Sequence, residues 1–280
     1  MRVFISADME GISGVASPHD VIREGDAYDA GQALMHRDVN AAIEGAVAGG
    51  ATEVLVNDSH SSMRNLNRDE LDDRATLIRG NTKPRSMVQG LDADHDVALF
   101  VGYHAMAGTA GGVLNHTFLG HEVIALRVNG TEMGELGWNL RFAAALGVPV
   151  GLVTGDDATT REAASEPGSP ETVTVKTGID RFTARCRPTS DTCDDIMQAA
   201  RRAVDRTNDG VVPYPDVEGQ TVVSVDWATT NQAGAAAGTP DVERQGGRQT
   251  CVTADSYVEA YEAAVAMLRA GASGSNDHYG

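Results

Sequence analysis

Short apolar runs alternate with longer segments of helical periodicity along the first half of the chain. The runs predict strands at residues 2–7, 53–56, 75–78, 97–103, 122–128 and 148–153, whereas apolar residues recur at helical spacing over residues 30–48 and 134–146. The runs are nearly continuous, as is typical of parallel strands that helices cover on both faces. The order strand, helix, strand over residues 2–56 predicts a βαβ unit with a right-handed crossover. We therefore expect a mostly parallel sheet between layers of helices.

The pattern changes after Gly155, where a helical segment at residues 158–165 precedes the turn-rich sequence EPGSPE. Further strands are predicted at residues 172–176, 221–227 and 249–253, and further helices at residues 191–206 and 257–268. We therefore predict an α/β fold with two lobes and a tail. These are a three-layer, mostly parallel sheet lobe at residues 1–157, a smaller α/β or α+β lobe at residues 158–270, and a disordered tail at residues 271–280.

The charge balance is strongly acidic, because 40 Asp and Glu residues outnumber 22 Lys and Arg residues and give a formal net charge of -18 at pH 7. Such a surface repels phosphate backbones and anionic lipids, so we expect neither nucleic acid nor membrane as a partner. The lysines are Lys83 and Lys176 alone. Few lysines with many acidic residues resemble proteins that stay soluble in concentrated salt, so we predict a halophilic protein; an ordinary acidic enzyme is the alternative.

A cytoplasmic location is expected from the absence of export and redox signals. Asp8 and Glu10 interrupt the only early apolar stretch, so no secretory signal is present. The longest apolar stretch without charge, residues 142–155, is shorter than the ~18 residues that span a bilayer. The 3 cysteines are odd in number and lack C-x-x-C spacing, which suits unpaired thiols in a reducing compartment.

Candidate metal ligands lie where the predicted strands of the first lobe end. Asp8 and Glu10 follow the first strand, His60 closes the NDSH sequence after the second, and His104 closes the GYH sequence after VALFV. Ligands bind outside the carboxyl ends of strands in open α/β sheets, so these side chains are expected to converge. Carboxylates and imidazoles are ligands of zinc and similar ions, and with Glu135 they exceed one tetrahedral site. Asp8 bridging two ions about 3.5 to 4 Å apart would use all five.

Each candidate also has a structural interpretation. Asp8 by itself is more often a turn residue or helix cap, and His60 and His104 could each be hydrogen-bonded interior histidines. Glu135 could be a first-turn glutamate favoured by the helix dipole. His116 follows the glycine-rich AGTAGG sequence and could be an ordinary loop histidine, but its basicity near pH 7 suits proton transfer.

Several motifs in order carry a family resemblance. SADMEGISG, VLVNDSHSSMRNL, KPRSMVQGLD, GYHAMAG and NGTEMGELGWN resemble the zinc-dependent D-aminopeptidases encoded in dipeptide-transport operons. The resemblance covers most of residues 1–157 and continues more weakly through VSVDWATTNQAG. It implies two zinc ions per chain, although other divalent metals would suit the same donors, and a catalytic role for His116. The implied zinc ligands are Asp8, Glu10, His60, His104 and Glu135. Family members look like ring-shaped homodecamers, so a homo-oligomer is expected.

The resulting functional prediction is a metal-dependent aminopeptidase that releases N-terminal D-amino acids from short peptides through a dinuclear zinc site. Stereospecificity depends on the shape of the pocket, which no motif reports, so an L-specific or broad aminopeptidase or amidase stays open. A non-catalytic, metal-dependent peptide-binding module is a second alternative. A binuclear phosphoesterase is a third, weakened because the metal motifs contain no basic residues that would clamp a phosphate.

Overall fold

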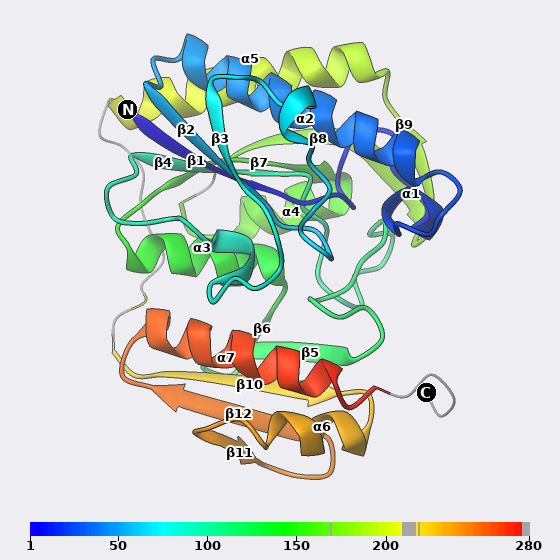
Figure 1. Cartoon of the computed structure of the whole chain (residues 1–280), viewed down its shortest axis with the longest axis vertical. Coiled ribbons are helices and arrows are strands. Elements are labelled where there is room, and N and C mark those ends of the chain that lie inside the picture. The colour runs from blue at the N-terminus through cyan, green and yellow to red at the C-terminus, as the bar shows by residue number, and fades with distance from the viewer. Residues whose placement is uncertain (169, 209–216, 218, 276–280) are drawn as a thin grey trace.

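The computed structural model describes residues 1–168, 170–208, 217 and 219–275. Within these residues the strands form two sheets (Figure 1). Sheet A has the order β3-β2-β1-β4-β7-β8-β9, and every pair is parallel except the hairpin of β8 and β9. Its strands are β1 (Arg2–Ala7), β2 (Glu53–Asp58), β3 (Ala75–Ile78), β4 (Val97–Val101), β7 (Val150–Asp156), β8 (Glu171–Asp180) and β9 (Thr183–Cys186).

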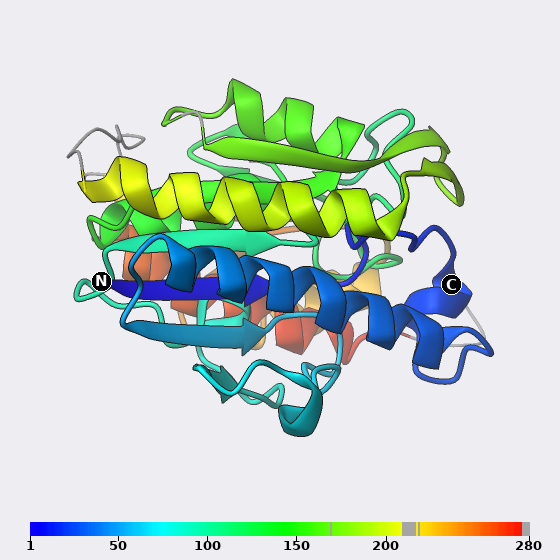
Figure 2. The ribbon, with the colours of Figure 1, turned by 90° about the horizontal axis from the view of Figure 1, so that it is seen from above.

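Two long helices cover one face of sheet A. Helices α2 (Tyr28–Ala48) and α5 (Thr189–Asn208) run side by side over β1, β4 and β7 (Figure 2). Gly45 lets the two backbones approach closely, because a Cβ there would overlap the carbonyl oxygen of Met197. Alternate residues of β1 point to this face, and Val3 and Ile5 are fully buried among the helix side chains. The short helix α1 (Pro18–Val21) begins with a capping box at Ser17.

Sheet B is antiparallel and packs against the other face of sheet A through helices. Its order is β11-β12-β10-β5-β6, and α3 and α7 lie between the sheets (Figure 1). Burial alternates along β10, so one face of sheet B points to the core and the other is more exposed. The remaining elements are β5 (Val123–Val128), β6 (Thr131–Met133), β10 (Thr221–Trp227), β11 (Val242–Arg244), β12 (Gln249–Ala254), α3 (Glu135–Ala145), α4 (Asp157–Ser165), α6 (Thr230–Ala236), α7 (Tyr257–Ala272) and the single turns η1 (Arg68–Glu70) and η2 (Ser86–Val88).

The predicted α/β fold with a mostly parallel sheet is confirmed, but the chain divides between the sheets differently from the division expected at residue 157. Strands β5 and β6 precede this residue and lie in sheet B, whereas β8, β9 and α5 follow it and complete sheet A. The apolar pattern of a strand reports its burial and carries no information on which sheet it joins. The short elements β6, β11 and α6 gave no periodic signal.

Part of the tail predicted to be disordered is helical. Helix α7 extends to Ala272, because Gly271 lies directly against the ring of Trp227 and leaves no room for a Cβ. Residues 276–280 of the predicted tail lie outside the described residues. Among the helices that the structure describes, none combines the length and apolarity needed to cross a membrane.

Candidate metal centre

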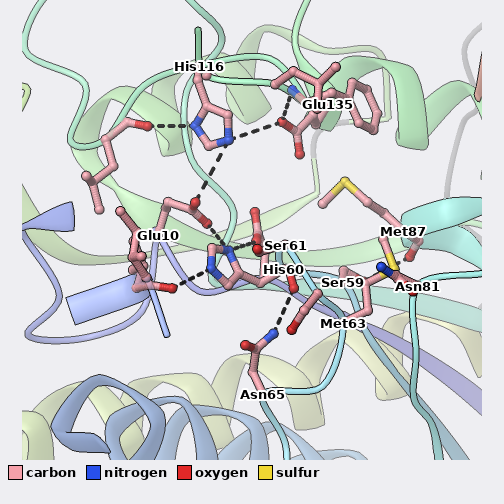
Figure 3. Close-up of a pocket in the computed structure, with 18 of the residues that line it drawn as sticks. Glu10, Ser59, His60, Ser61, Met63, Asn65, Asn81, Met87, His116 and Glu135 are labelled. Atoms are coloured by element: carbon pink, nitrogen blue, oxygen red, sulfur yellow. Dashed lines mark hydrogen bonds and ion pairs between the residues drawn. The ribbon is translucent and has the colours of Figure 1, made fainter. Parts of the chain in front are cut away.

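All six predicted site residues meet at the carboxyl edge of sheet A (Figure 3). The pairing of Ala7 with both Asp58 and Val101 places the ends of β1, β2 and β4 at one level. Five residues are buried, and the side chain of the sixth, His116, is 18% exposed. They come from the loops after β1 and β2, from the long loop that joins β4 to β5 and from the first turn of α3: Asp8, Glu10, His60, His104, His116 and Glu135.

Glycines allow the ligand-bearing loops after β1 and β4 to pack backbone against backbone. The amide of Asp8 donates to the carbonyl of Val101 and that of Gly11 to the carbonyl of Gly102, both at 2.8 Å. Gly102 has a φ of 74° and lies so close to the carbonyl of Asp8 that a Cβ would overlap it. The GYH and ADMEG sequences therefore form one unit that holds Asp8 beside His104.

Asp8 lies between two histidines and faces one with each oxygen. His60 Nδ1 is 3.5 Å from Asp8 Oδ1 and 2.9 Å from Glu10 Oε2. His104 Nε2 is 3.5 Å from Asp8 Oδ2 and 3.3 Å from Glu135 Oε1. The carboxylate thus links two groups of donors, each completed by one histidine and one glutamate.

His116 lies above both groups (Figure 3). Its Nε2 is 3.9 Å from Glu10 Oε1 and 3.8 Å from Glu135 Oε1, longer than the corresponding distances of the other two histidines. Its ring stacks on that of His104 with 4.0 Å between centroids and 13° between planes. Burial and the nearby charge of His104 lower the pKa of His116, so its ring is neutral near pH 7.

The outer nitrogen of each histidine contacts a backbone carbonyl. His60 Nε2 is 2.9 Å from the oxygen of Val21, His104 Nδ1 is 3.1 Å from that of Ala105, and His116 Nδ1 is 2.8 Å from that of Leu114. A carbonyl only accepts, so one proton is assigned to this side of each ring. In the neutral form that binds a metal ion, the inner nitrogen of each ring would direct a lone pair at the carboxylates. Lone pairs of nitrogen and carboxylate oxygen repel unless a proton or cation lies between them. This donor set fits a divalent cation.

The hydrogen bonding of Asp8 is also incomplete. Its Oδ1 accepts the amide of Met9 at 2.8 Å, whereas Oδ2 is buried with no hydrogen-bond partner among the residues that the structure describes. Buried polar atoms are rarely left unpaired, because each such atom costs about 1–3 kcal/mol. An orphaned oxygen facing His104 is the acceptor that a metal ion would satisfy.

Burial and charge act in opposite directions on the titration of the cluster. Burial and the neighbouring charge of Glu10 raise the pKa of Asp8 to about 7. Burial alone would raise the pKa values of Glu10 and Glu135, but the charges of His60 and His104, respectively, outweigh it and lower both. The same pairs raise the pKa values of His60 and His104 well above the usual value despite burial. Three carboxylates in one buried cluster thus need positive charge beside them.

Both lysines of the chain support this edge of the sheet, which the sequence analysis missed. Buried Lys176 donates to the carbonyls of Glu10, Ile12 and Val15 at 2.5, 2.9 and 2.6 Å. Buried Lys83 donates at 2.7 Å to the side-chain oxygen of Asn57 and to the carbonyl of Asp58. The scarcity of lysine in the sequence was the available signal. Lys176 places its charge among three backbone oxygens, and Lys83 places its charge between one side-chain oxygen and one backbone oxygen.

The cluster opens into a cavity of about 820 Å³, within the range of small-ligand sites. Apolar side chains from α7, from the loop before β5 and from the tip of the β8–β9 hairpin form much of its wall, among them Leu268, Phe118 and Phe182. Arginines also line it, and α7 brings side chains from the sheet B side of the molecule. A ligand of peptide size would contact the metal donors and both sheets' helices together.

The fold and the donor cluster define a metal-dependent peptidase. The family model described as D-aminopeptidase, peptidase family M55, matches residues 1–266, so the chain belongs to this family. The D-aminopeptidase of Bacillus subtilis (strain 168) is 37% identical over 268 residues, which are 95% of this chain and 96% of that protein. A solved structure, a Zn-dependent D-aminopeptidase DppA from Bacillus subtilis described as a self-compartmentalizing protease, superposes with a TM-score of 0.90 at 36% identity. The superposition covers 97% of this chain and 98% of the chain in the solved structure. The family resemblance seen in the sequence motifs is confirmed.

Proposed function

We propose that this chain is a zinc-dependent aminopeptidase that removes N-terminal D-amino acids from short peptides, with two zinc ions per chain. The observation that carries the proposal is the position of Asp8, whose two oxygens face two separate histidine and glutamate pairs. The Bacillus subtilis relative described as a Zn-dependent D-aminopeptidase supports zinc as the metal and D-residues as the preferred substrates.

The proposed ligands divide into two sets that share Asp8. One set adds Glu10 and His60, and the other adds His104 and Glu135. His116 Nε2 is also close enough to Glu135 to belong to the second set. We assign it to proton transfer instead, because it is the most exposed of the six, makes the longest contacts to the carboxylates and follows a glycine-rich loop.

When bound, zinc supplies Lewis-acid polarisation of a carbonyl and activation of a water molecule. His116 is neutral near pH 7, and its Nδ1–H is held by the carbonyl of Leu114, so Nε2 is the atom that accepts a proton. Glu10 and Glu135 face this Nε2 and would stabilise the imidazolium formed.

A panel of D- and L-aminoacyl amides tests the proposal, with metal content measured on the same protein. We expect hydrolysis of the D-series with two zinc ions per chain. Preference for the L-series would support the L-specific alternative, and zinc-loaded protein that binds a dipeptide without cleaving it would support the peptide-binding module. Two anomalous peaks within about 4 Å of one another beside Asp8 are expected in a crystal. A single peak in fully metallated protein would contradict the dinuclear site.

The role of His116 has its own test. His116→Ala should keep two zinc ions and lose at least about a hundredfold in kcat, the usual contribution of a positioned acid or base. Full activity with both ions bound would remove His116 from the mechanism. Loss of one zinc ion would make it a ligand.

Three further predictions concern the whole protein. A homo-oligomer is supported by the relative described as a self-compartmentalizing protease. The decamer stays a prediction from the family resemblance, and light scattering of the purified protein tests both. Halophilic behaviour is supported by the net charge of -18 and by the burial of both lysines. A melting temperature that rises with KCl is expected, and one unchanged up to molar salt would contradict the prediction. A cytoplasmic location stays a prediction from the sequence.

A further inference from the structure

Arginines line the cavity beside the donor cluster, and two of them have structural partners. Arg23 lies over the ring of Tyr28 and donates to the carbonyl of Arg64 at 2.9 Å. Arg269 donates to the carbonyls of Asn81 and Lys83. Both guanidinium groups are therefore occupied in holding the loop and helix that form the wall.

Arg181 lines the same cavity without such a partner. Its Nε is buried and finds no hydrogen-bond acceptor in the described part of the chain, and no carboxylate there forms an ion pair with it. Its guanidinium group lies over the ring of Phe182, 5.3 Å from Cζ to the centroid. A guanidinium is always charged, and nothing in the described chain offsets the loss of water at its buried Nε–H donor.

The position of Arg181 is fixed relative to His116. Arg181 forms the tip of the β8–β9 hairpin, and its carbonyl accepts the amide of Leu114 at 2.7 Å, two residues before His116. Below the tip, Gly178 lies so close to Gly111 that a Cβ would overlap the carbonyl oxygen of that glycine. The hairpin tip and the loop that carries His116 therefore form one packed unit, which fixes the backbone of Arg181 relative to that of His116.

Arg64 is the other arginine of the cavity wall whose side chain makes no hydrogen bond or ion pair within the described residues. It is exposed, so water satisfies its donors. Arg181 differs because its Nε is shielded from water. Arg181 is therefore the arginine of the cavity wall that still needs a hydrogen-bond acceptor among the described residues.

We propose that Arg181 binds the C-terminal carboxylate of the peptide substrate and so selects short peptides with a free carboxyl end. The inference rests on the proposed function, which places the amino end of the substrate at the metal ligands. A guanidinium presents parallel N–H donors that match the two oxygens of a carboxylate. Phe182 beneath the guanidinium orients its plane. Because both ends of the substrate contact one cavity of about 820 Å³, only a short peptide engages both.

The test compares alanylglycine with alanylglycinamide, using the alanine configuration that the aminoacyl amide panel selects. Wild-type, zinc-loaded enzyme should prefer the free acid. In Arg181→Ala, kcat/KM for the free acid should fall about 10- to 100-fold, the effect of one charge-assisted pair, mainly through KM. The amide should change by less than about threefold, because it offers no negative charge. Arg181→Lys should recover part of the preference, because it restores the charge without the fork of donors.

A binding measurement gives a readout that does not depend on turnover. Analogues of the two dipeptides with a methylene in place of the scissile carbonyl should show the same loss of discrimination by calorimetry. Arg185→Ala is the matched control, because Arg185 lies on the same hairpin, is exposed and is absent from the cavity wall. It removes the same charge and should leave the preference unchanged.

The outcomes separate the two levels of the proposal. Cleavage of neither dipeptide by zinc-loaded wild type would refute the proposed function and this inference with it. Suppose that wild type cleaves both dipeptides. Equal losses of kcat/KM for the free acid and the amide in Arg181→Ala would then refute the carboxylate contact alone. The same would follow if Arg185→Ala lowered the preference for the free acid as much as Arg181→Ala does. Loss of the preference in Arg64→Ala and not in Arg181→Ala would overturn the assignment to Arg181.

Discussion

Two buried polar regions at the carboxyl edge of sheet A differ in how completely their charges are satisfied. At the donor cluster, three histidine nitrogens face carboxylate oxygens, and Asp8 Oδ2 has no hydrogen-bond partner among the described residues. At Lys176, which lies on β8 and is distant from Asp8 in the chain, one ammonium donates to the carbonyl oxygens of Glu10, Ile12 and Val15. Folding thus supplies protein partners for the Lys176 ammonium, whereas the donor cluster keeps polar atoms that a ligand would pair. Incomplete pairing identifies the functional region, and complete pairing identifies its support.

The lysine region also shows a residual effect of burial. Burial lowers the pKa of Lys176 to about 8 even though oxygens surround it. The nearby charge of Asp156 acts in the opposite direction without restoring the usual value. Burying the Lys176 ammonium therefore costs free energy even when its hydrogen bonds are complete. In return, the ammonium holds the loop that carries Asp8 and Glu10.

The largest expected effect is on the function of the donor cluster. Asp8→Asn should abolish binding of both zinc ions and lower kcat/KM by about 10³-fold or more, because the shared carboxylate is lost. Metal-free Asp8→Asn should melt no lower than metal-free wild type at pH 8, since the amide removes repulsion with Glu10. Metal analysis and thermal melting with a chelator measure both quantities.

Asp226→Asn is the control for this change, because Asp226 pairs with Arg127 at 2.6 Å on sheet B, away from the cluster. It should keep zinc and activity and lose no more than about 1 kcal/mol of stability. Retention of two zinc ions by Asp8→Asn would contradict the bridging role.

The second effect is on stability and arises in the lysine region. Lys176→Met should lower the free energy of unfolding by about 3 kcal/mol or more, because three buried carbonyls lose their donor. The loop carrying Asp8 and Glu10 should loosen as a result, so zinc affinity should fall as well. Urea denaturation and zinc titration test the two parts. Arg185→Met removes an exposed cation and should stay within about 0.5 kcal/mol of wild type; equal losses in the two variants would mean that the carbonyl contacts contribute nothing specific.

The smallest effect is a pH dependence at a third buried charge. Asp38 on α2 accepts the amide of Ser13 at 2.8 Å, and burial raises its pKa to about 6 from 3.8. A raised carboxyl pKa means that the folded state binds more protons, so this group's stabilising contribution is complete below about pH 3.8 and is lost as pH rises to about 6. The stability of wild type relative to Asp38→Asn should fall by about 1 kcal/mol between pH 5 and pH 7.

Urea denaturation of both metal-free proteins at the two pH values measures this difference. Protonation of the donor-cluster side chains affects both proteins equally and therefore cancels in the difference. A difference in unfolding free energy that does not vary between pH 5 and pH 7 would show that Asp38 is ionised in the folded protein throughout this range. Its charge would then be fully paired, like that of Lys176.

The strand-end motifs predicted the donor cluster because local sequence fixes where a parallel strand ends. ADMEG, NDSH and GYH each follow an apolar run, and the carboxyl ends of neighbouring parallel strands share an edge. Glu135 and His116 were harder, since neither follows a strand of sheet A. The family resemblance carried those two, and the structure brings them to the cluster through α3 and the loop before β5.

The sequence by itself determined the apolar periodicity, hence most strands and helices. It also determined the chemical types of the proposed metal donors, from which the class of reaction was predicted. The tertiary structure decided which sheet each strand joins, because burial looks alike in both sheets. It also decided that Lys83 and Lys176 hold the loops of the donor cluster. The buried Nε of Arg181, in the cavity wall, has no hydrogen-bond acceptor among the described residues. These contacts join residues far apart in the chain, and a charge acts according to which atoms surround it in space.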